Sequence, residues 1–141
     1  VKANMFFSED LANVIYGAAD MILIPSRFEP CGLTQLMSFR YGTVPVVRHT
    51  GGLADTVVNY SRATGEGTGF SFRNCSSDEM MIAIGEALKL YDNKTEWNKL
   101  VMELDYSWNV SAIKYVRLYE GATGLTDNDT KKVLRKVYRV A

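Results

Sequence analysis

The sequence predicts an α/β fold, in which a parallel sheet is flanked by helices. Short apolar runs at residues 21–25 and 44–48 have the length of buried strands. They alternate with stretches such as residues 9–18, where apolar side chains recur at helical spacing. Such alternation is typical of parallel strands joined by crossover helices.

The first third of the chain contains four expected elements. Residues 3–7 are short and apolar and predict a strand, after which Ser8 stands where a helix N-cap is expected. Residues 9–18 predict a helix, and residues 21–25, which are apolar throughout, predict a fully buried strand. Residues 33–41 predict a second helix, because a glycine directly after them can end it.

The remaining elements are predicted in the same way. Residues 44–48 and 69–72 are expected strands, residues 53–60 a short helix, and the Gly-rich, charged residues 61–68 an exposed mobile loop. Further helices are expected over residues 78–91, 95–104 and 108–122. Ser107 is expected to cap the last of these helices, and Trp97 and Trp108 are expected to be packing residues.

The segment Arg-Phe-Glu-Pro-Cys-Gly-Leu-Thr-Gln at residues 27–35 carries the strongest chemical signal. It joins a predicted strand to a predicted helix, whose free N–H groups and positive dipole end attract phosphate. Gly32 lets a ligand approach that backbone closely, and the Glu29 carboxylate can accept hydrogen bonds from hydroxyls. Phosphate and hydroxyls together indicate a sugar nucleotide.

The same segment closely resembles bacterial glycogen synthases and plant starch synthases. The resemblance also includes residues 40–48 and the Thr-Gly-Gly-Leu-Ala-Asp-Thr-Val run at residues 50–57, and it extends from about Phe7 to about Tyr119. These enzymes are retaining glucosyltransferases with two Rossmann-like domains, the GT-B architecture. The resemblance implies that the chain is part of the C-terminal domain of such an enzyme and that a missing N-terminal domain holds the acceptor site.

The implied reaction moves glucose from ADP-glucose, or UDP-glucose, to the non-reducing end of an α-1,4-glucan. It needs no metal and no cofactor, because helix dipole, backbone N–H groups and cationic side chains neutralise the leaving diphosphate. In the family, the Arg and Lys that grip the phosphates precede the segment matching Val1. We therefore expect the parent to be an enzyme and this chain alone to be inactive.

The resemblance assigns roles to residues of the loop. Glu29 would hold hydroxyls of the donor glucose, and backbone N–H groups of Cys31 and Gly32 would bind the donor. Leu33 and Thr34 would reach the diphosphate, with a capping hydroxyl as a compatible role for Thr34. A covalent role for Cys31 is not expected, because no base lies nearby in the sequence.

Outside the loop, Phe7 aligns with an aromatic residue that stacks on the nucleoside, although it can equally be a core residue. Gly51 and Gly52 either line the same cleft edge or are needed only for a tight turn. Arg27 is expected to position the loop, and His49, the single histidine, is expected to be a loop residue without a catalytic role.

Composition sets further bounds. Sixteen basic residues balance sixteen acidic ones, so there is no basic footprint for nucleic acid. No segment of the sequence has the pattern of a membrane span. Two cysteines form neither a disulfide framework nor a zinc-site pattern. We expect a reducing compartment, either bacterial cytoplasm or plastid stroma.

Two domains are expected: a partial nucleotide-sugar-binding domain over residues 1–124 and a basic helical or disordered tail over residues 125–141. Two other interpretations stay open. One is a non-catalytic nucleotide-sugar-binding module, and the other is a GT-B transferase with another sugar substrate. Met37 argues against the second, because many other GT-B transferases have a glutamate there.

Overall fold

The computed structural model describes residues 2–102, 104–124, 128–129 and 132 of the chain. The chain divides into two compact units, Val1–Leu104 and Asp105–Ala141. The first unit contains the sheet, and its last helix ends shortly before Leu104. The expected boundary at residue 124 stays a prediction.

The described residues form a three-stranded parallel sheet in the order β1 (Met21–Ile24), β2 (Val44–Arg48) and β3 (Phe70–Phe72). Met21 pairs with Val44 and Val46 pairs with Phe70. Central β2 is apolar and lies between two neighbours, so four of its five residues are buried. The expected parallel sheet is confirmed.

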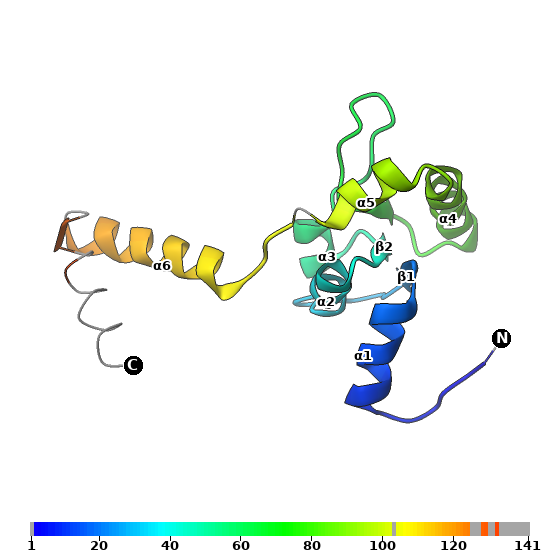
Figure 1. Ribbon diagram of the computed structural model, residues 1–141, viewed down its shortest axis with the longest axis horizontal. Coiled ribbons are helices and arrows are strands. Elements are labelled where there is room, and N and C mark those ends of the chain that lie inside the picture. The colour runs from blue at the N-terminus through cyan, green and yellow to red at the C-terminus, as the bar shows by residue number, and fades with distance from the viewer. Residues whose placement is uncertain (1, 103, 125–127, 130–131, 133–141) are drawn as a thin grey trace. The chain divides into compact units, whose positions relative to one another are not determined.

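Six helices lie in the described residues, five in the unit that contains the sheet and α6 in the second unit (Figure 1). They are α1 (Glu9–Ala18), α2 (Thr34–Tyr41), α3 (Gly51–Thr56), α4 (Ser77–Tyr91), α5 (Lys94–Met102) and α6 (Trp108–Thr123). Helix α2 packs on β1 and β2, α4 packs on β3 and β2, and α5 contacts α2, α4 and β2. The hydrophobic core therefore lies between β2 and the helices that cover it.

Trp97 of α5 belongs to this core, as expected. It is 3% exposed, and its ring stacks on Phe70 with a centroid separation of 6.4 Å. The Tyr91 ring meets it edge-on at 5.3 Å. Trp108, at the start of α6, is instead 80% exposed, so its expected packing role is wrong within the described residues.

Local capping explains several helix ends. The Ser8 hydroxyl accepts a 3.2 Å hydrogen bond from the Leu11 N–H, which confirms the expected cap of α1. Gly42 ends α2 with φ 81°, a left-handed conformation that glycine adopts readily. Ser107 occupies the N-cap position of α6, but its hydroxyl makes no capping hydrogen bond, so that part of the prediction is wrong.

Three predicted elements need correction. Residues 3–7 are not a strand, because their backbone pairs with no neighbouring strand among the described residues. β1 is not fully buried: it is an edge strand, and Leu23 on it is 41% exposed. The helix expected over residues 53–60 ends at Thr56, because the chain after it turns into extended pairing.

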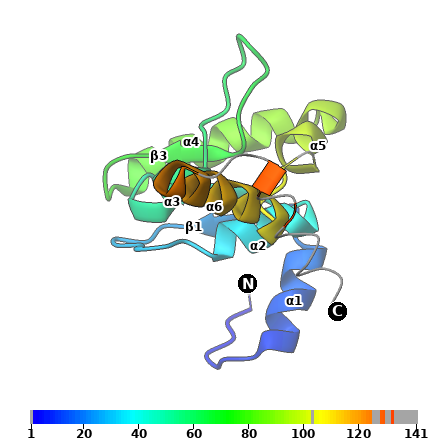
Figure 2. The same cartoon turned by 90° about the vertical axis from the view of Figure 1, so that its left-hand side faces the viewer.

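That pairing forms a protruding hairpin over residues 57–69, which stands clear of the sheet in both Figure 1 and Figure 2. The Tyr60 N–H donates to Gly69 O at 2.8 Å, and the Ser61 N–H donates to Glu66 O at 2.8 Å. Residues 62–66 at its tip are exposed, as expected for this loop. The hydrogen bonds give the segment defined structure; its mobility stays a prediction.

Candidate functional site

The predicted functional loop begins where β1 ends. Residues 25–33 connect β1 to α2, and residues 49–50 connect β2 to α3. Since β1 and β2 are parallel neighbours, both connections lie at the carboxyl edge of the sheet. Ligands of open α/β sheets characteristically bind at this edge.

Gly51 and Gly52, at the start of α3, lie directly against the loop. The Gly52 N–H donates a 3.1 Å hydrogen bond to Glu29 O. A Cβ at Gly51 would overlap Glu29 O, and a Cβ at Gly52 would overlap Cys31 O. Gly51 also has φ 47°. The two glycines are thus required because the backbones of the loop and of α3 pack closely. This role differs from both expected ones, a cleft edge and a tight turn. Their role as a cleft edge stays a prediction.

The Glu29 side chain is half-buried and is held from within the loop. Its Oε2 accepts a hydrogen bond of 3.0 Å from the Ser26 hydroxyl. No hydrogen bond to Oε1 is found among the described residues. An ionised carboxylate with one oxygen fixed and the other unused can accept a hydrogen bond from a ligand hydroxyl.

The N-terminus of α2 provides donors beside this carboxylate's loop. Leu33 occupies the N-cap position, and no side chain of the described residues caps the helix. The first-turn N–H groups, including that of Thr34, therefore remain available for an anion, and the helix dipole favours negative charge there. Leu33 is 56% exposed and Thr34 is half-buried. The expected capping role of the Thr34 hydroxyl is not seen.

Cys31 and Gly32 complete the loop. Cys31 is an exposed free thiol, and Gly32 is buried with φ 69°. A Cβ on Gly32 would come within 2.7 Å of the Gln35 amide nitrogen. Gly32 is therefore needed for its left-handed backbone and for space towards Gln35. Its predicted close approach to a ligand is not tested by this packing.

Phe7 is the predicted site residue that the structure does not bring to the loop. It is 89% exposed and lies in the segment before α1, which Figure 1 shows well apart from the loop after β1. This exposure is inconsistent with a core position within the described residues. Nucleoside stacking by Phe7 stays a prediction.

Comparison with known proteins identifies the family. Residues 4–100 match the sequence profile of the glycosyl transferases group 1. The chain belongs to this family of glycosyltransferases. It is 56% identical over 123 residues to a glycogen synthase of Lachnospira eligens and 54% identical over 127 residues to one of Clostridium beijerinckii. These alignments cover 84% and 88% of this chain but 26% of each relative, so the chain spans about a quarter of their length.

A solved structure is also similar: the catalytic domain of starch synthase IV from Arabidopsis thaliana, bound to ADP and acarbose. Its TM-score is 0.72 at 37% identity, over 85% of this chain and 26% of that one. The expected α/β fold with the Rossmann-like sheet of a GT-B glycosyltransferase is confirmed, as is the resemblance to glycogen and starch synthases.

Gln35 is a residue of this glycosyltransferase segment whose importance sequence analysis missed. It is fully buried, and its Nε2 donates a 2.9 Å hydrogen bond to the Thr56 hydroxyl, which donates at 2.8 Å to Gly52 O. This chain of bonds ties the start of α2 to both ends of α3. The available sequence signal was the position of Gln35, which directly follows Thr34 at the end of the segment of residues 27–35.

Arg48 was also missed. Sequence analysis expected Arg27 to position the loop, but Arg27 is exposed. The Arg48 guanidinium instead donates to Ser26 O at 3.3 Å and to Arg27 O at 2.6 Å. The expectation for Arg27 is therefore wrong, because the Arg48 guanidinium binds the Arg27 carbonyl oxygen and positions this part of the loop. His49 is an exposed loop residue, as expected.

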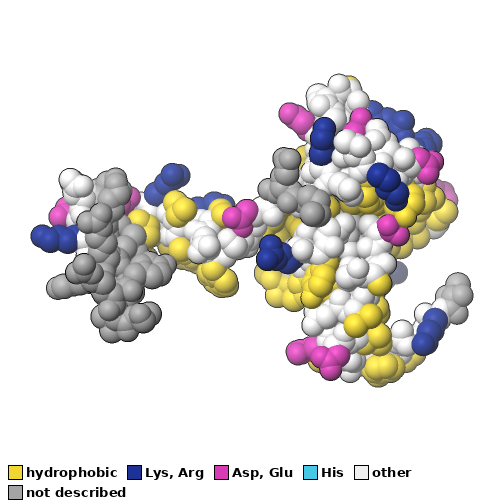
Figure 3. Space-filling view, viewed as in Figure 1, with side chains coloured by type: hydrophobic (Ala, Val, Ile, Leu, Met, Phe, Trp, Pro, Cys, Tyr) yellow, Lys and Arg dark blue, Asp and Glu magenta, His cyan; other side chains and the backbone are white. Residues whose placement is uncertain are grey.

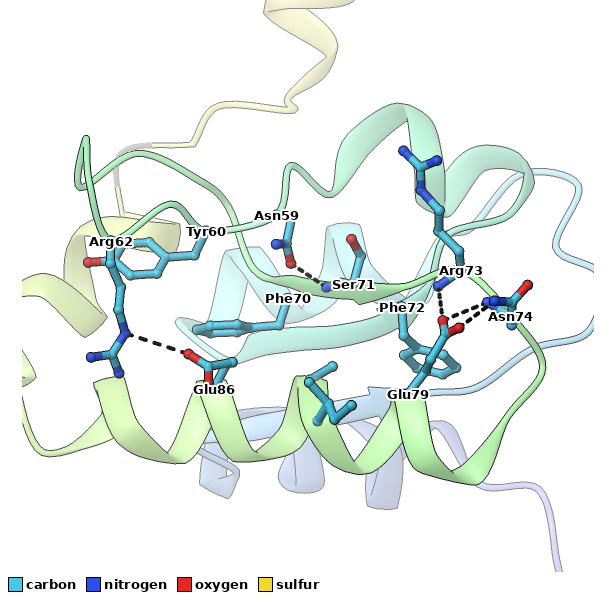
Figure 4. A pocket seen from close by; sticks show the side chains of 12 residues that line it. Asn59, Tyr60, Arg62, Phe70, Ser71, Phe72, Arg73, Asn74, Glu79 and Glu86 are labelled. Carbon is cyan, nitrogen blue, oxygen red and sulfur yellow. Dashed lines mark hydrogen bonds and ion pairs between the residues drawn. The ribbon is translucent and has the colours of Figure 1, made fainter.

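A hollow of about 520 Å³ lies elsewhere, between β3, the base of the hairpin and α4 (Figure 4). Its charged side chains largely satisfy one another and the local backbone. Arg62 pairs with Glu86 at 3.6 Å, and Glu79 accepts the N–H groups of Arg73 and Asn74 at 3.1 and 2.9 Å. None of its residues belongs to the predicted site.

Among the residues that the structure describes, no three or more His, Cys, Asp or Glu side chains are grouped so that they could hold a metal ion. No described helix has the length and apolar character that a membrane span requires.

Proposed function

We propose that this chain forms much of the donor-binding site of a glycogen or starch synthase. The reaction is transfer of glucose from ADP-glucose to the non-reducing end of an α-1,4-glucan with retention, and the acceptor is bound by a domain outside this chain. One observation carries the proposal: the uncapped start of α2 and the Glu29 carboxylate belong to one loop at the carboxyl edge of β1 and β2.

Each part of the loop has a chemical task. The N–H groups of Leu33 and Thr34, with the dipole of α2, receive the diphosphate and stabilise its charge as it leaves. Glu29 accepts hydrogen bonds from glucose hydroxyls and is preorganised by Ser26 at 3.0 Å. The ADP bound to the Arabidopsis neighbour supports an adenine nucleotide over a uridine nucleotide. A reducing cellular compartment suits the two free cysteines, Cys31 and Cys75.

The test is a chimeric enzyme, in which this chain replaces the matching segment of the Lachnospira eligens glycogen synthase. We expect it to incorporate glucose into glycogen from ADP-glucose faster than from UDP-glucose, and to produce α-linked glucan. The unmodified Lachnospira enzyme is the positive control. A folded chimera that binds ADP but transfers no glucose would instead indicate a non-catalytic nucleotide-sugar module.

A further inference from the structure

We propose that Arg48 is a positioning residue for Glu29, acting through Ser26; this inference rests on the proposed function. Arg48 is the last residue of β2, where its backbone pairs with Phe72 of β3. Its side chain reaches the other way, to the end of the neighbouring strand β1. There Nη1 is shared between the carbonyl oxygens of Ser26 and Arg27.

The bonds continue from Ser26 to the carboxylate. Ser26 presents its carbonyl to Arg48 and its hydroxyl to Glu29 Oε2 at 3.0 Å. The guanidinium and the carboxylate are thus linked through a single intermediate residue. A shift of the Ser26 backbone would move the hydroxyl that orients Glu29.

Few other contacts define this loop. Residues 25–33 are neither helix nor strand. Within the described part of the chain, the hydrogen bonds that reach residues 26–31 from outside the loop come from Arg48 and from the Gly52 N–H. Arg48 holds the first half of the loop, and Gly52 holds Glu29 O at 3.1 Å.

The chemistry of Arg48 favours this role over simple packing. Its Nε is buried without a hydrogen-bond partner, which costs free energy that a lysine or methionine would avoid. A planar guanidinium offers donors in a fixed geometry, whereas a lysine ammonium is a flexible point charge. We infer that Arg48 stabilises one loop geometry rather than the fold as a whole.

The first measurement is amide hydrogen exchange, followed by NMR in the 141-residue chain. The Gly52 amide is the reporter, because its proton is bonded to Glu29 O. In Arg48→Met we expect its protection to fall at least ~10-fold, while the Val57 amide, bonded to Leu53 O, keeps its protection. Arg40→Met, which removes an exposed cation from the last turn of α2, is the matched control and leaves both amides unchanged.

The second measurement is steady-state kinetics of the chimera. Misplacement of Glu29 should lower kcat by ~10- to 100-fold in Arg48→Met, with KM for ADP-glucose changed less than ~3-fold. Arg48→Lys should recover part of kcat, and Arg40→Met should match the parent. Should Arg48→Met fail to fold, Arg48→Lys decides, with smaller losses of Gly52 protection and kcat expected.

The inference is overturned if Gly52 protection is unchanged in the folded Arg48 variants, or if protection falls and kcat does not. A parent chimera without transferase activity refutes the proposed function instead, and the exchange measurement then decides on its own whether Arg48 holds the loop.

Discussion

The main-chain N–H of Gly52 donates a 3.1 Å hydrogen bond to the carbonyl oxygen of Glu29. This bond joins the start of α3 to the loop that carries the proposed donor-binding carboxylate. A Cβ at Gly51 or Gly52 would overlap the backbone of that loop. The loop after β1 and the start of α3 are therefore closely packed against each other. The position of Glu29 therefore depends on β2 and α3 as much as on its own loop.

Replacing Gly52 by alanine should disturb the packing of α3 against the loop after β1. The added methyl group would overlap Cys31 O, so we expect the free energy of unfolding to fall by about 2 kcal/mol or more. Gly85→Ala in α4 is the control, because its Cβ meets no atom within 4 Å and alanine favours helix, giving a gain of about 0.5–1 kcal/mol. Urea denaturation of both variants checks the prediction, and equal stabilities would contradict it.

Glu29→Ala in the chimera should reduce turnover about 100-fold, because hydrogen bonds to glucose hydroxyls are lost as positive charge develops on the sugar. ADP binding should change far less, since the start of α2 still receives the diphosphate. Kinetics and ADP titration measure the two effects. Intact turnover together with lost ADP binding would show that Glu29 has been assigned the wrong role.

Thr34→Val should have the opposite effect. The Thr34 hydroxyl is expected to reach a phosphate oxygen from the first turn of α2. Loss of this hydroxyl should therefore weaken the binding of ADP and of ADP-glucose by similar factors, about 5- to 10-fold. Ser77→Val, at the exposed first turn of α4, is a comparable change outside the site and should leave ADP binding unchanged. Calorimetric titration with ADP compares the two variants. Equal affinities for ADP would show that Thr34 does not contact the diphosphate.

Tyr60 links the hairpin to α5 through a 2.7 Å hydrogen bond from its hydroxyl to Glu96 Oε2. This bond to the carboxylate, together with burial, raises the pKa of Tyr60 above its ordinary value. Tyr60→Phe should lower the free energy of unfolding by about 1 kcal/mol. Tyr41→Phe, which loses an exposed 3.4 Å bond to Asn13, should change it by less than about 0.5 kcal/mol. Chemical denaturation at neutral pH distinguishes the two.

Glu79 should make the stability of the fold depend on pH in the acidic range. Hydrogen bonds from the main-chain and side-chain N–H groups of Asn74, and from the Arg73 N–H, hold the pKa of Glu79 below its ordinary 4.5. A lowered pKa in the folded state contributes stability above about pH 4.5, and that contribution is lost as the pH falls through the folded-state pKa. Melting temperatures from pH 7 to 3 should fall less steeply in Glu79→Gln than in the parent. Parallel curves would contradict this assignment.

Exposed apolar side chains indicate where sequence reasoning was weakest. Met5, Phe6 and Phe7 are 94%, 66% and 89% exposed, and Figure 3 shows hydrophobic side chains on the surface along α1 and the segment before it. Their apolar character predicted a strand, but a strand requires a neighbour to pair with. The basic tail predicted over residues 125–141 lies largely outside the described residues and stays a prediction.

By itself the sequence determined the order of the three strands and of the helices after residue 8, because periodicity is a local pattern, and their alternation predicted parallel pairing. Periodicity, the Ser8 cap and the glycine after α2 are all encoded within a few neighbouring residues. Only the tertiary structure decided that Arg48 rather than Arg27 holds the loop, and that Gln35 joins α2 to α3. Those contacts link residues 21 positions apart, whose partners depend on which strand ends lie side by side.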